Sequence, residues 1–237
     1  MIDAPDEITY DTLLRGRVGL YQPARGFRSS LDPVLLASFA RPPFGRFLDI
    51  GCGTGALSFV LLARDPEATG VGVEIQPRLA ALAERGSARN GFGPRYQVRV
   101  GDVREMALGV FDLVATNPPF RPLGTGVLPP DPERSIAHHE VALTLAGWLE
   151  VAAAALAPAG RLCVIFPAER LAELHAGLKL RGLCATRQRL VHAQAGLAAS
   201  RVLVEAARAG ALAEEPPLVL HEGGSFTPEV RRMLGEE

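Results

Sequence analysis

From about Arg46 onward, short apolar runs rich in β-branched residues alternate with longer segments rich in alanine and leucine. Runs of four to six such residues, bounded by glycine, proline or polar residues, are typical of strands in a buried sheet. The pattern predicts strands at residues 47–50, 71–75, 97–100, 111–116, 161–166, 188–191 and 201–205. Repeated strand–helix units of this length imply right-handed crossovers onto a parallel sheet that is covered on both faces.

The expected fold is therefore α/β, a doubly wound and mostly parallel seven-stranded sheet with an antiparallel edge. The antiparallel edge is expected because no clear helix separates the last two strands. Helices are predicted from the turn after the first strand to about Arg64, and at about 77–90, 139–157 and 168–180. Residues 1–45 are predicted to be an N-terminal extension, and residues 46–237 to be the main domain.

Composition excludes several classes of protein. Hydrophobic residues make up 48% of the 237 residues and charged residues 22%, which argues against disorder and against a fibrous chain. Basic and acidic residues number 25 and 26, so overall charge cannot drive binding to nucleic acid, although a local basic patch can.

Three cysteines, Cys52, Cys163 and Cys184, have no C-x-x-C spacing, so neither a zinc site nor a disulfide framework is expected. The N-terminus lacks the apolar region of a signal peptide, and no apolar run approaches the length of a membrane span. We therefore expect a cytoplasmic protein with no membrane and no metal partner. The sequence leaves the oligomeric state open.

A glycine-rich loop follows the first predicted strand and reads Asp49-Ile50-Gly51-Cys52-Gly53-Thr54-Gly55. Glycines let a backbone turn tightly and approach a nucleotide without a Cβ in the way. Glu74 ends the second strand, where a carboxylate would bind two ribose hydroxyls. Because Gly51-x-Gly53-x-x-Ala56 also fits the dinucleotide fingerprint, the loop alone is consistent with NAD, with another adenosine cofactor or with a structural turn.

Two acids favour a cofactor that carries an amino acid. Asp49 lies inside the first strand, close to where a positively charged amino group could sit. Asp102, followed by Val103, ends the third strand and could present its carboxylate to an adenine amino group. The set resembles the S-adenosylmethionine-binding motifs of Rossmann-like methyltransferases. The resemblance implies a cofactor site formed by Asp49, Gly51, Gly53, Gly55, Glu74, Asp102 and Val103, with Arg28 nearby and with a contribution from residues 1–45.

The tetrapeptide Asn117-Pro118-Pro119-Phe120 directly follows the fourth strand, so it faces the same edge of the sheet. Two consecutive prolines stiffen the turn, which holds the Asn117 amide and the Pro118 carbonyl as two fixed acceptors. An exocyclic amino group conjugated to a ring is a poor nucleophile, and two acceptors on its protons make its nitrogen more electron-rich as a methyl group arrives. Phe120 would stack on the planar group. A rigid surface turn is the alternative.

Asn-Pro-Pro-aromatic at this position resembles the methyltransferases that modify adenine, guanine or protein glutamine nitrogens. Residues 21–37, where Asp32 is a predicted helix N-cap, and residues 130–140 resemble segments of the bacterial tRNA1(Val) (adenine-N6)-methyltransferases. Residues 189–192 and 226–229 resemble the closing elements of that family. The resemblance covers nearly the whole chain and implies S-adenosylmethionine-dependent methylation of an adenine in a tRNA anticodon loop.

Three alternatives remain open. A guanine-N2 ribosomal RNA methyltransferase would account for Phe120, because tyrosine is usual there in the adenine and glutamine enzymes. A protein glutamine-N5 methyltransferase would account for the tetrapeptide, but it normally carries a separate N-terminal helical domain. A non-catalytic module that binds RNA or a nucleotide is the third. His138 and His139 are adjacent and lack ligand spacing, so we expect a structural role for them.

Two stretches of the chain lack acidic residues. Residues 12–31 contain Arg15, Arg17, Arg25 and Arg28, and residues 174–204 contain Lys179, Arg181, Arg187, Arg189 and Arg201. They could form a rim that binds RNA phosphates. They could equally be the solvated faces of helices and strands.

Overall fold

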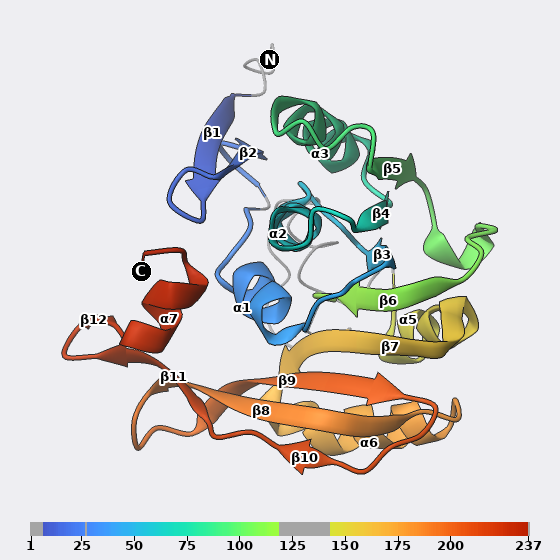
Figure 1. The fold of residues 1–237 in the computed structure, drawn as a ribbon, viewed down its shortest axis with the longest axis vertical. Coiled ribbons are helices and arrows are strands. Elements are labelled where there is room, and N and C mark those ends of the chain that lie inside the picture. Colours follow the sequence, from blue (N-terminus) through green and yellow to red (C-terminus); the bar gives the residue numbers. More distant parts are fainter. Residues whose placement is uncertain (1–6, 27, 119–142, 237) are drawn as a thin grey trace, which may run out of the picture.

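The computed structural model describes residues 7–26, 28–118 and 143–236. In these residues a ten-stranded sheet has the order β12-β11-β8-β9-β7-β6-β3-β4-β5, with β10 also paired to β8 (Figure 1). Its strands are β3 (Arg46–Ile50), β4 (Thr69–Glu74), β5 (Tyr96–Val100), β6 (Phe111–Thr116), β7 (Leu156–Pro167), β8 (Cys184–Gln194), β9 (Ala199–Ala207), β10 (Ala213–Glu214), β11 (Leu218–Glu222) and β12 (Ser225–Phe226).

The α/β, mostly parallel fold is confirmed. Strands β5, β4, β3, β6 and β7 are neighbours in this order and run parallel. Strand β9 pairs antiparallel with β8, as expected, and also with β7. The sheet continues past the seven predicted strands, because β11 pairs parallel with β8 and β12 pairs with β11. The antiparallel pair therefore lies inside the sheet, since β11 takes up the free side of β8.

Helices cover both faces of this sheet. They are α1 (Asp32–Phe39), α2 (Ala56–Arg64), α3 (Pro77–Arg89), α5 (Leu145–Ala155), α6 (Leu171–Lys179) and α7 (Pro228–Met233), with short 3₁₀ turns η1 (Val103–Glu105) and η2 (Ala168–Arg170). Side chains alternate across each strand, so Phe47 joins the apolar layer of α1 and α2, whereas Leu48 and Ile50 join that of α5 and α6. No helix among the described residues is both long enough and apolar enough to cross a membrane.

The helix predicted at about 139–157 differs from the structure. Residues 139–142 lie outside the described residues, α5 begins at Leu145, and it ends at Ala155. Strand β7 already begins at Leu156, because that residue pairs with Phe111 at the start of β6. The alanine-rich composition of the segment did not reveal this early return to the sheet.

Residues before the sheet form a hairpin and a helix. Strands β1 (Ile8–Leu13) and β2 (Val18–Pro23) pair antiparallel, and the hairpin lies beside α3 in Figure 1. Asn90 fixes this arrangement because its side chain accepts a bond from Gly19 N and donates one to Gly19 O, both at 2.7 Å. The prediction of Asp32 as an N-cap is wrong. Leu31 occupies that position, and the Asp32 carboxylate instead accepts a bond from Arg201 at 3.2 Å.

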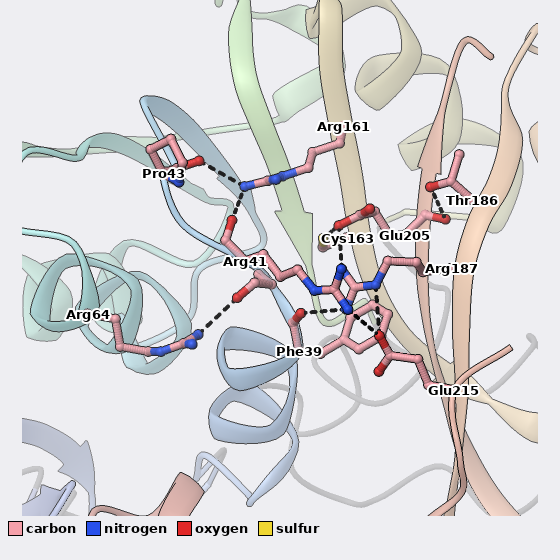
Figure 2. A network of polar contacts seen from close by, with 11 residues as sticks. Phe39, Arg41, Pro43, Arg64, Arg161, Cys163, Thr186, Arg187, Glu205 and Glu215 are labelled. Atoms are coloured by element: carbon pink, nitrogen blue, oxygen red, sulfur yellow. Dashed lines mark hydrogen bonds and ion pairs between the residues drawn. The ribbon is translucent and has the colours of Figure 1, made fainter. Parts of the chain in front are cut away.

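A polar network lies at the amino-terminal edge of the sheet (Figure 2). The Arg187 guanidinium donates to Glu205 at 2.8 Å, to Glu215 at 3.0 Å and to the Phe39 carbonyl at 3.0 Å, and it lies 4.2 Å from the centre of the Phe39 ring. Arg41 donates to the same Glu215 carboxylate at 2.9 Å. This network connects the loop before β3 to strands β8 and β9 and to the residue after β10.

Candidate active site

The carboxyl ends of four neighbouring parallel strands bring the predicted site residues into one row. Ile50 is in register with Val73 on one side and with Thr116 on the other. Backbone bonds of 2.9 Å continue the row, from Gly51 N to Val73 O and from Gly101 N to Glu74 O. Because adjacent strands lie about 4.8 Å apart, Asn117, the glycine loop, Glu74 and Asp102 follow one another along this edge.

The glycine loop has backbone conformations that side chains rarely adopt. Gly51, Gly53 and Gly55 have φ of 73°, 54° and 91°. A Cβ on Gly55 would lie 2.5 Å from the Phe59 ring, which explains the glycine there by packing. A Cβ on Gly51 would meet nothing within 4 Å, so the glycine at this position instead leaves an open concave surface at the strand end.

Glu74 is buried and holds the loop in place. One carboxylate oxygen accepts a bond from Gly53 N at 2.8 Å, and the other accepts one from Gln76 N at 2.9 Å. Each carboxylate oxygen has two lone pairs and so can accept more than one hydrogen bond. The residue predicted to bind ribose hydroxyls therefore also shapes the glycine loop.

Asp49 is fully buried beneath the same loop. Its carboxylate accepts a bond from the Ser58 hydroxyl at 2.6 Å. Burial raises the pKa of Asp49 to about 7, and the nearby charge of Glu74 also raises it, whereas the bonds from Ser58 lower it. An acid with this pKa gains from a cationic neighbour, because a positive charge favours its ionised form. Ser58, on α2, has no motif that would have revealed this role.

Asn117 lies at the strand end beside the glycine loop. The two share a pocket whose wall includes Ser29 and Pro33 from the N-terminal segment. The Asn117 Oδ1 atom is buried, and it has no hydrogen-bond partner among the residues that the structure describes. Pro118 is also buried, whereas Pro119, Phe120, His138 and His139 lie outside the described residues.

Asp102 stands at the end of the row, where its carboxylate is already bound. It accepts bonds from the Arg104 backbone at 2.9 Å and from the Arg104 guanidinium, and these contacts hold the pKa of Asp102 below its ordinary value. Val103 points into the apolar layer shared with Leu48 and Ile50. Contact of either residue with an adenine stays a prediction.

Arg28 is directed toward the hairpin. Its guanidinium donates to Asp11 at 2.7 Å, to Thr9 at 2.7 Å and to the Pro23 carbonyl at 2.9 Å. It thereby ties the segment that leads into α1 to strand β1. A direct contact of Arg28 with the cofactor stays a prediction.

The acid-free stretch at 174–204 is neither a free cationic rim nor simply a solvated face. Arg187 is bound to Glu205 and Glu215, Arg189 to Glu229, and Arg201 to Asp32. Acids distant in sequence supply these partners, so the absence of local carboxylates was misleading. In the stretch 12–31, Arg15 and Arg28 also have partners, whereas Arg17 and Arg25 are exposed.

The residues at this strand edge fit S-adenosylmethionine. The open surface at Gly51 admits a close ligand, and Asp49 and Glu74 provide acceptors for an amino group and for hydroxyls. Thr54 Oγ1 is a second buried atom without a partner in the described part of the chain, and it also lies at this pocket. Of eight such atoms in the described residues, these two lie at the pocket, where a bound ligand would satisfy them.

Comparison with protein families gives a match to the model described as methyltransferase small domain, over residues 30–173. A curated relative from Porphyromonas gingivalis (strain ATCC 33277) is named tRNA1(Val) (adenine(37)-N6)-methyltransferase. It is 31% identical over 233 residues, covering 92% of this chain and 91% of the relative. A relative from Rhodospirillum rubrum is named release factor glutamine methyltransferase. It is 34% identical over 150 residues, covering 59% of this chain and 45% of the relative.

Among solved structures, one from Agrobacterium tumefaciens is described as a predicted O-methyltransferase. It is similar to this chain with a TM-score of 0.67 and 29% identity, and the match covers 86% of this chain and 96% of the other. The similarity therefore extends over the sheet and its covering helices, with few residues of the neighbour left unmatched.

Proposed function

The chain belongs to the methyltransferase small-domain family and is an S-adenosylmethionine-dependent methyltransferase, and we propose that it methylates the exocyclic N6 amino group of an adenine in tRNA. The substrate is suggested by the relative from Porphyromonas gingivalis, which matches this chain over almost its full length. The observation that carries the proposal is the buried Asn117 Oδ1 beside the glycine loop, which has no partner among the described residues.

Asn117 and Pro118 give the site its proposed chemistry. The bound cofactor supplies an electrophilic methyl group. The Asn117 Oδ1 and the Pro118 carbonyl accept hydrogen bonds from the two N–H groups of the substrate amino group, which orients its nitrogen and raises the electron density there. Phe120 stacks on the base. No strong base is required, because the methylated nitrogen becomes acidic and loses its proton to water.

The rest of the site acts by holding and positioning. Gly51, Gly53 and Gly55 would admit the cofactor to the strand end, where Asp49 would bind its amino group and Glu74 its ribose. Asp102 and Val103 would hold its adenine. Much of the acceleration comes from holding the donor and the nitrogen in line, which spares the entropic cost of bringing them together.

We also propose that residues 1–45 contribute to the cofactor site of the domain at 46–237. Ser29 and Pro33 support this role, since both line the pocket that contains Asp49 and Asn117. The hydrogen bonds of Arg28 to the hairpin would hold that segment in place.

A protein glutamine residue is the second candidate substrate. The similarity to the Rhodospirillum rubrum relative favours it, because a glutamine side-chain amide also presents two protons on a planar nitrogen. The match spans less than half of that relative, whereas the match to the tRNA enzyme spans both chains almost completely. We therefore favour the adenine.

Methyl transfer from isotope-labelled S-adenosylmethionine tests the proposal. Unmodified tRNA, ribosomal RNA and a protein extract are each incubated with the enzyme and digested, and the labelled unit is identified by mass spectrometry. N6-methyladenosine from tRNA supports the proposal. N2-methylguanosine from ribosomal RNA or N5-methylglutamine from protein would overturn the substrate, and cofactor binding without label in any pool would favour a non-catalytic binding module.

A further inference from the structure

One side of α3 and the adjoining hairpin form a strip of arginine and tyrosine side chains, which we call the arginine–tyrosine strip. Its members are Tyr10, Tyr21, Arg78, Arg85 and Arg89. At 100° per residue the three arginines fall within about 40° of one another around the helix, so they form a single row. The row extends over roughly 16 Å from the first arginine to the last, at 1.5 Å per residue.

The side chains of the strip are stacked and accessible. The guanidinium of Arg85 lies 3.9 Å from the centre of the Tyr21 ring, and that of Arg89 lies 6.0 Å from the centre of the Tyr10 ring. The two tyrosine rings are 5.1 Å apart. Tyr10 is 47% exposed, and both stacked arginines are exposed. The strip therefore exposes aromatic rings and cationic groups side by side on one surface.

No carboxylate of the described residues pairs with Arg85 or Arg89. The single acid of α3, Glu84, is turned about 100° away from Arg85. On the hairpin, Asp11 is bound by Arg28 and Gln22. The strip thus keeps a net positive charge, in contrast to the paired arginines of β8 and β9.

Both elements of the strip are connected through short segments to residues of the active-site pocket. Helix α3 begins three residues after Glu74, and Gln76 N is bonded to that carboxylate. Strand β2 leads into the segment that carries Ser29, which lines the pocket together with Asn117. A polymer that places one nucleotide at Asn117 can therefore continue along the strip.

We propose that the arginine–tyrosine strip binds the RNA substrate outside the catalytic pocket. This inference rests on the proposed function, because it assumes that the substrate is RNA. Arg85 and Arg89 would neutralise backbone phosphates, with the salt dependence that such contacts carry. The exposed face of Tyr10 would stack on an unpaired base, an interaction that single-stranded nucleic acids make with aromatic side chains.

A pair of matched charge reversals tests the strip. Arg89 and Lys179 are each the basic residue in the last turn of a helix, α3 and α6, and both are exposed. Reversing either charge removes the same favourable interaction with a helix C-terminus. Lys179→Glu therefore controls for helix stability, and it also examines the other stretch of basic residues.

Binding of a fluorescein-labelled, unmodified tRNA1(Val) transcript is measured by anisotropy at several salt concentrations. We expect Arg85→Glu/Arg89→Glu to weaken binding about tenfold or more and to reduce the slope of log affinity against log salt by one to two. Lys179→Glu should bind as the wild type does. Calorimetric affinity for S-adenosylhomocysteine should be unchanged in all three proteins, which shows that the fold and the cofactor site are intact.

The outcomes separate the two proposals. If the wild type and the double variant bind and methylate the transcript equally well, the inference that the strip binds RNA is wrong and the proposed function stands. If the wild type does not bind this RNA and labels a protein instead, both the proposed function and the inference about the strip are wrong. If the double variant loses cofactor affinity, Arg85→Gln and Arg89→Gln are measured singly, and unchanged RNA affinity in both overturns the strip.

Discussion

Buried polar groups differ in their hydrogen bonding between the two edges of the sheet. At the amino-terminal edge the Arg187 guanidinium donates to two carboxylates and a carbonyl, and Arg161 donates to the carbonyls of Arg41 and Pro43 (Figure 2). At the carboxyl edge the buried atoms Asn117 Oδ1 and Thr54 Oγ1 have no partner among the described residues. At the amino-terminal edge each arginine therefore donates to at least one partner, although the buried Arg161 Nε has none among the described residues, whereas the two buried atoms at the carboxyl edge have none at all there.

This contrast separates stability from function. Removing one partner of a buried charge network leaves the other charge uncompensated, which lowers the free energy of unfolding. An unpaired buried acceptor already costs free energy in the folded state. Removing it breaks no hydrogen bond within the protein, so the free energy of unfolding should not fall. Substitutions at the two edges should therefore affect different measurements.

The largest effect is expected at Asn117. Asn117→Ala removes one acceptor for the substrate amino group, so the rate of methyl transfer should fall at least about 10²-fold. Affinity for S-adenosylhomocysteine and the free energy of unfolding should stay near the wild-type values. Single-turnover transfer, calorimetry and denaturant unfolding measure the three quantities.

Asn90→Ala is the matched control for that change. The Asn90 side chain makes its bonds inside the protein, to Gly19 and to Gly86. Its loss should lower the free energy of unfolding by about 1–3 kcal/mol and leave the rate at saturating substrate unchanged. Equal losses of rate in both variants would remove the distinction between them.

At the opposite edge, Arg187→Ala leaves Glu205 and Glu215 without their shared cation. The Arg187 side chain is only 10% exposed, so we expect a loss of about 3 kcal/mol in the free energy of unfolding, with the rate per folded molecule unchanged. Arg41 binds the same Glu215 but is 65% exposed. Arg41→Ala should lower the free energy of unfolding by less than about 1 kcal/mol. Similar losses in Arg41→Ala and Arg187→Ala would show that burial of the arginine does not determine the loss.

The same two edges show what the sequence could predict. Strand positions, the glycine loop and the Asn117 tetrapeptide are local patterns, because each depends on residues within one strand–turn unit. The partners of Arg187, Arg189 and Arg201 come from segments far away in the chain, so no local pattern could show that these arginines are paired. Strands β10 and β11 were missed for the same reason, because both pair with β8, which is distant in the sequence. The β1–β2 and β11–β12 pairings are local, and they were missed although their partners are close in the chain.

Gly51→Ala should separate cofactor binding from backbone strain. Gly51 and Gly91 have nearly equal φ, 73° and 72°, and a Cβ at either meets nothing within 4 Å. Both alanine variants should lose about 1 kcal/mol of stability from the left-handed conformation. Only the change at Gly51 places a methyl group in the cofactor pocket, so only it should weaken S-adenosylhomocysteine binding, by about tenfold. Equal affinities in calorimetry would place the cofactor elsewhere.

The smallest expected effect is the pH dependence due to Asp49. Its pKa in the free protein is about 7, and a cationic amino group of the ligand would lower that pKa. Binding would then release a proton, so affinity for S-adenosylhomocysteine should rise between pH 6 and 7 and level off above. Asp49→Asn should abolish this dependence, and a slope that survives in this variant would assign the proton to another group.

The folded-state pKa of Asp49 also has a consequence for stability. Because it lies above the ordinary value near 4, the favourable contribution of Asp49 to folding is complete at pH 4 and is lost as the pH rises through 7. Denaturant unfolding of the wild type and of Asp49→Asn across this range should show a pH-dependent difference of that sign.

A crystal structure with S-adenosylhomocysteine and a tRNA anticodon stem-loop tests most directly whether the acceptors at the carboxyl edge bind the substrate amino group. We predict that the exocyclic nitrogen of an adenine lies within hydrogen-bond distance of both Asn117 Oδ1 and the Pro118 carbonyl, with the cofactor against Gly51. A complex in which the Asn117 side chain instead binds the cofactor, with no substrate amino group at these two acceptors, would contradict the proposed mechanism.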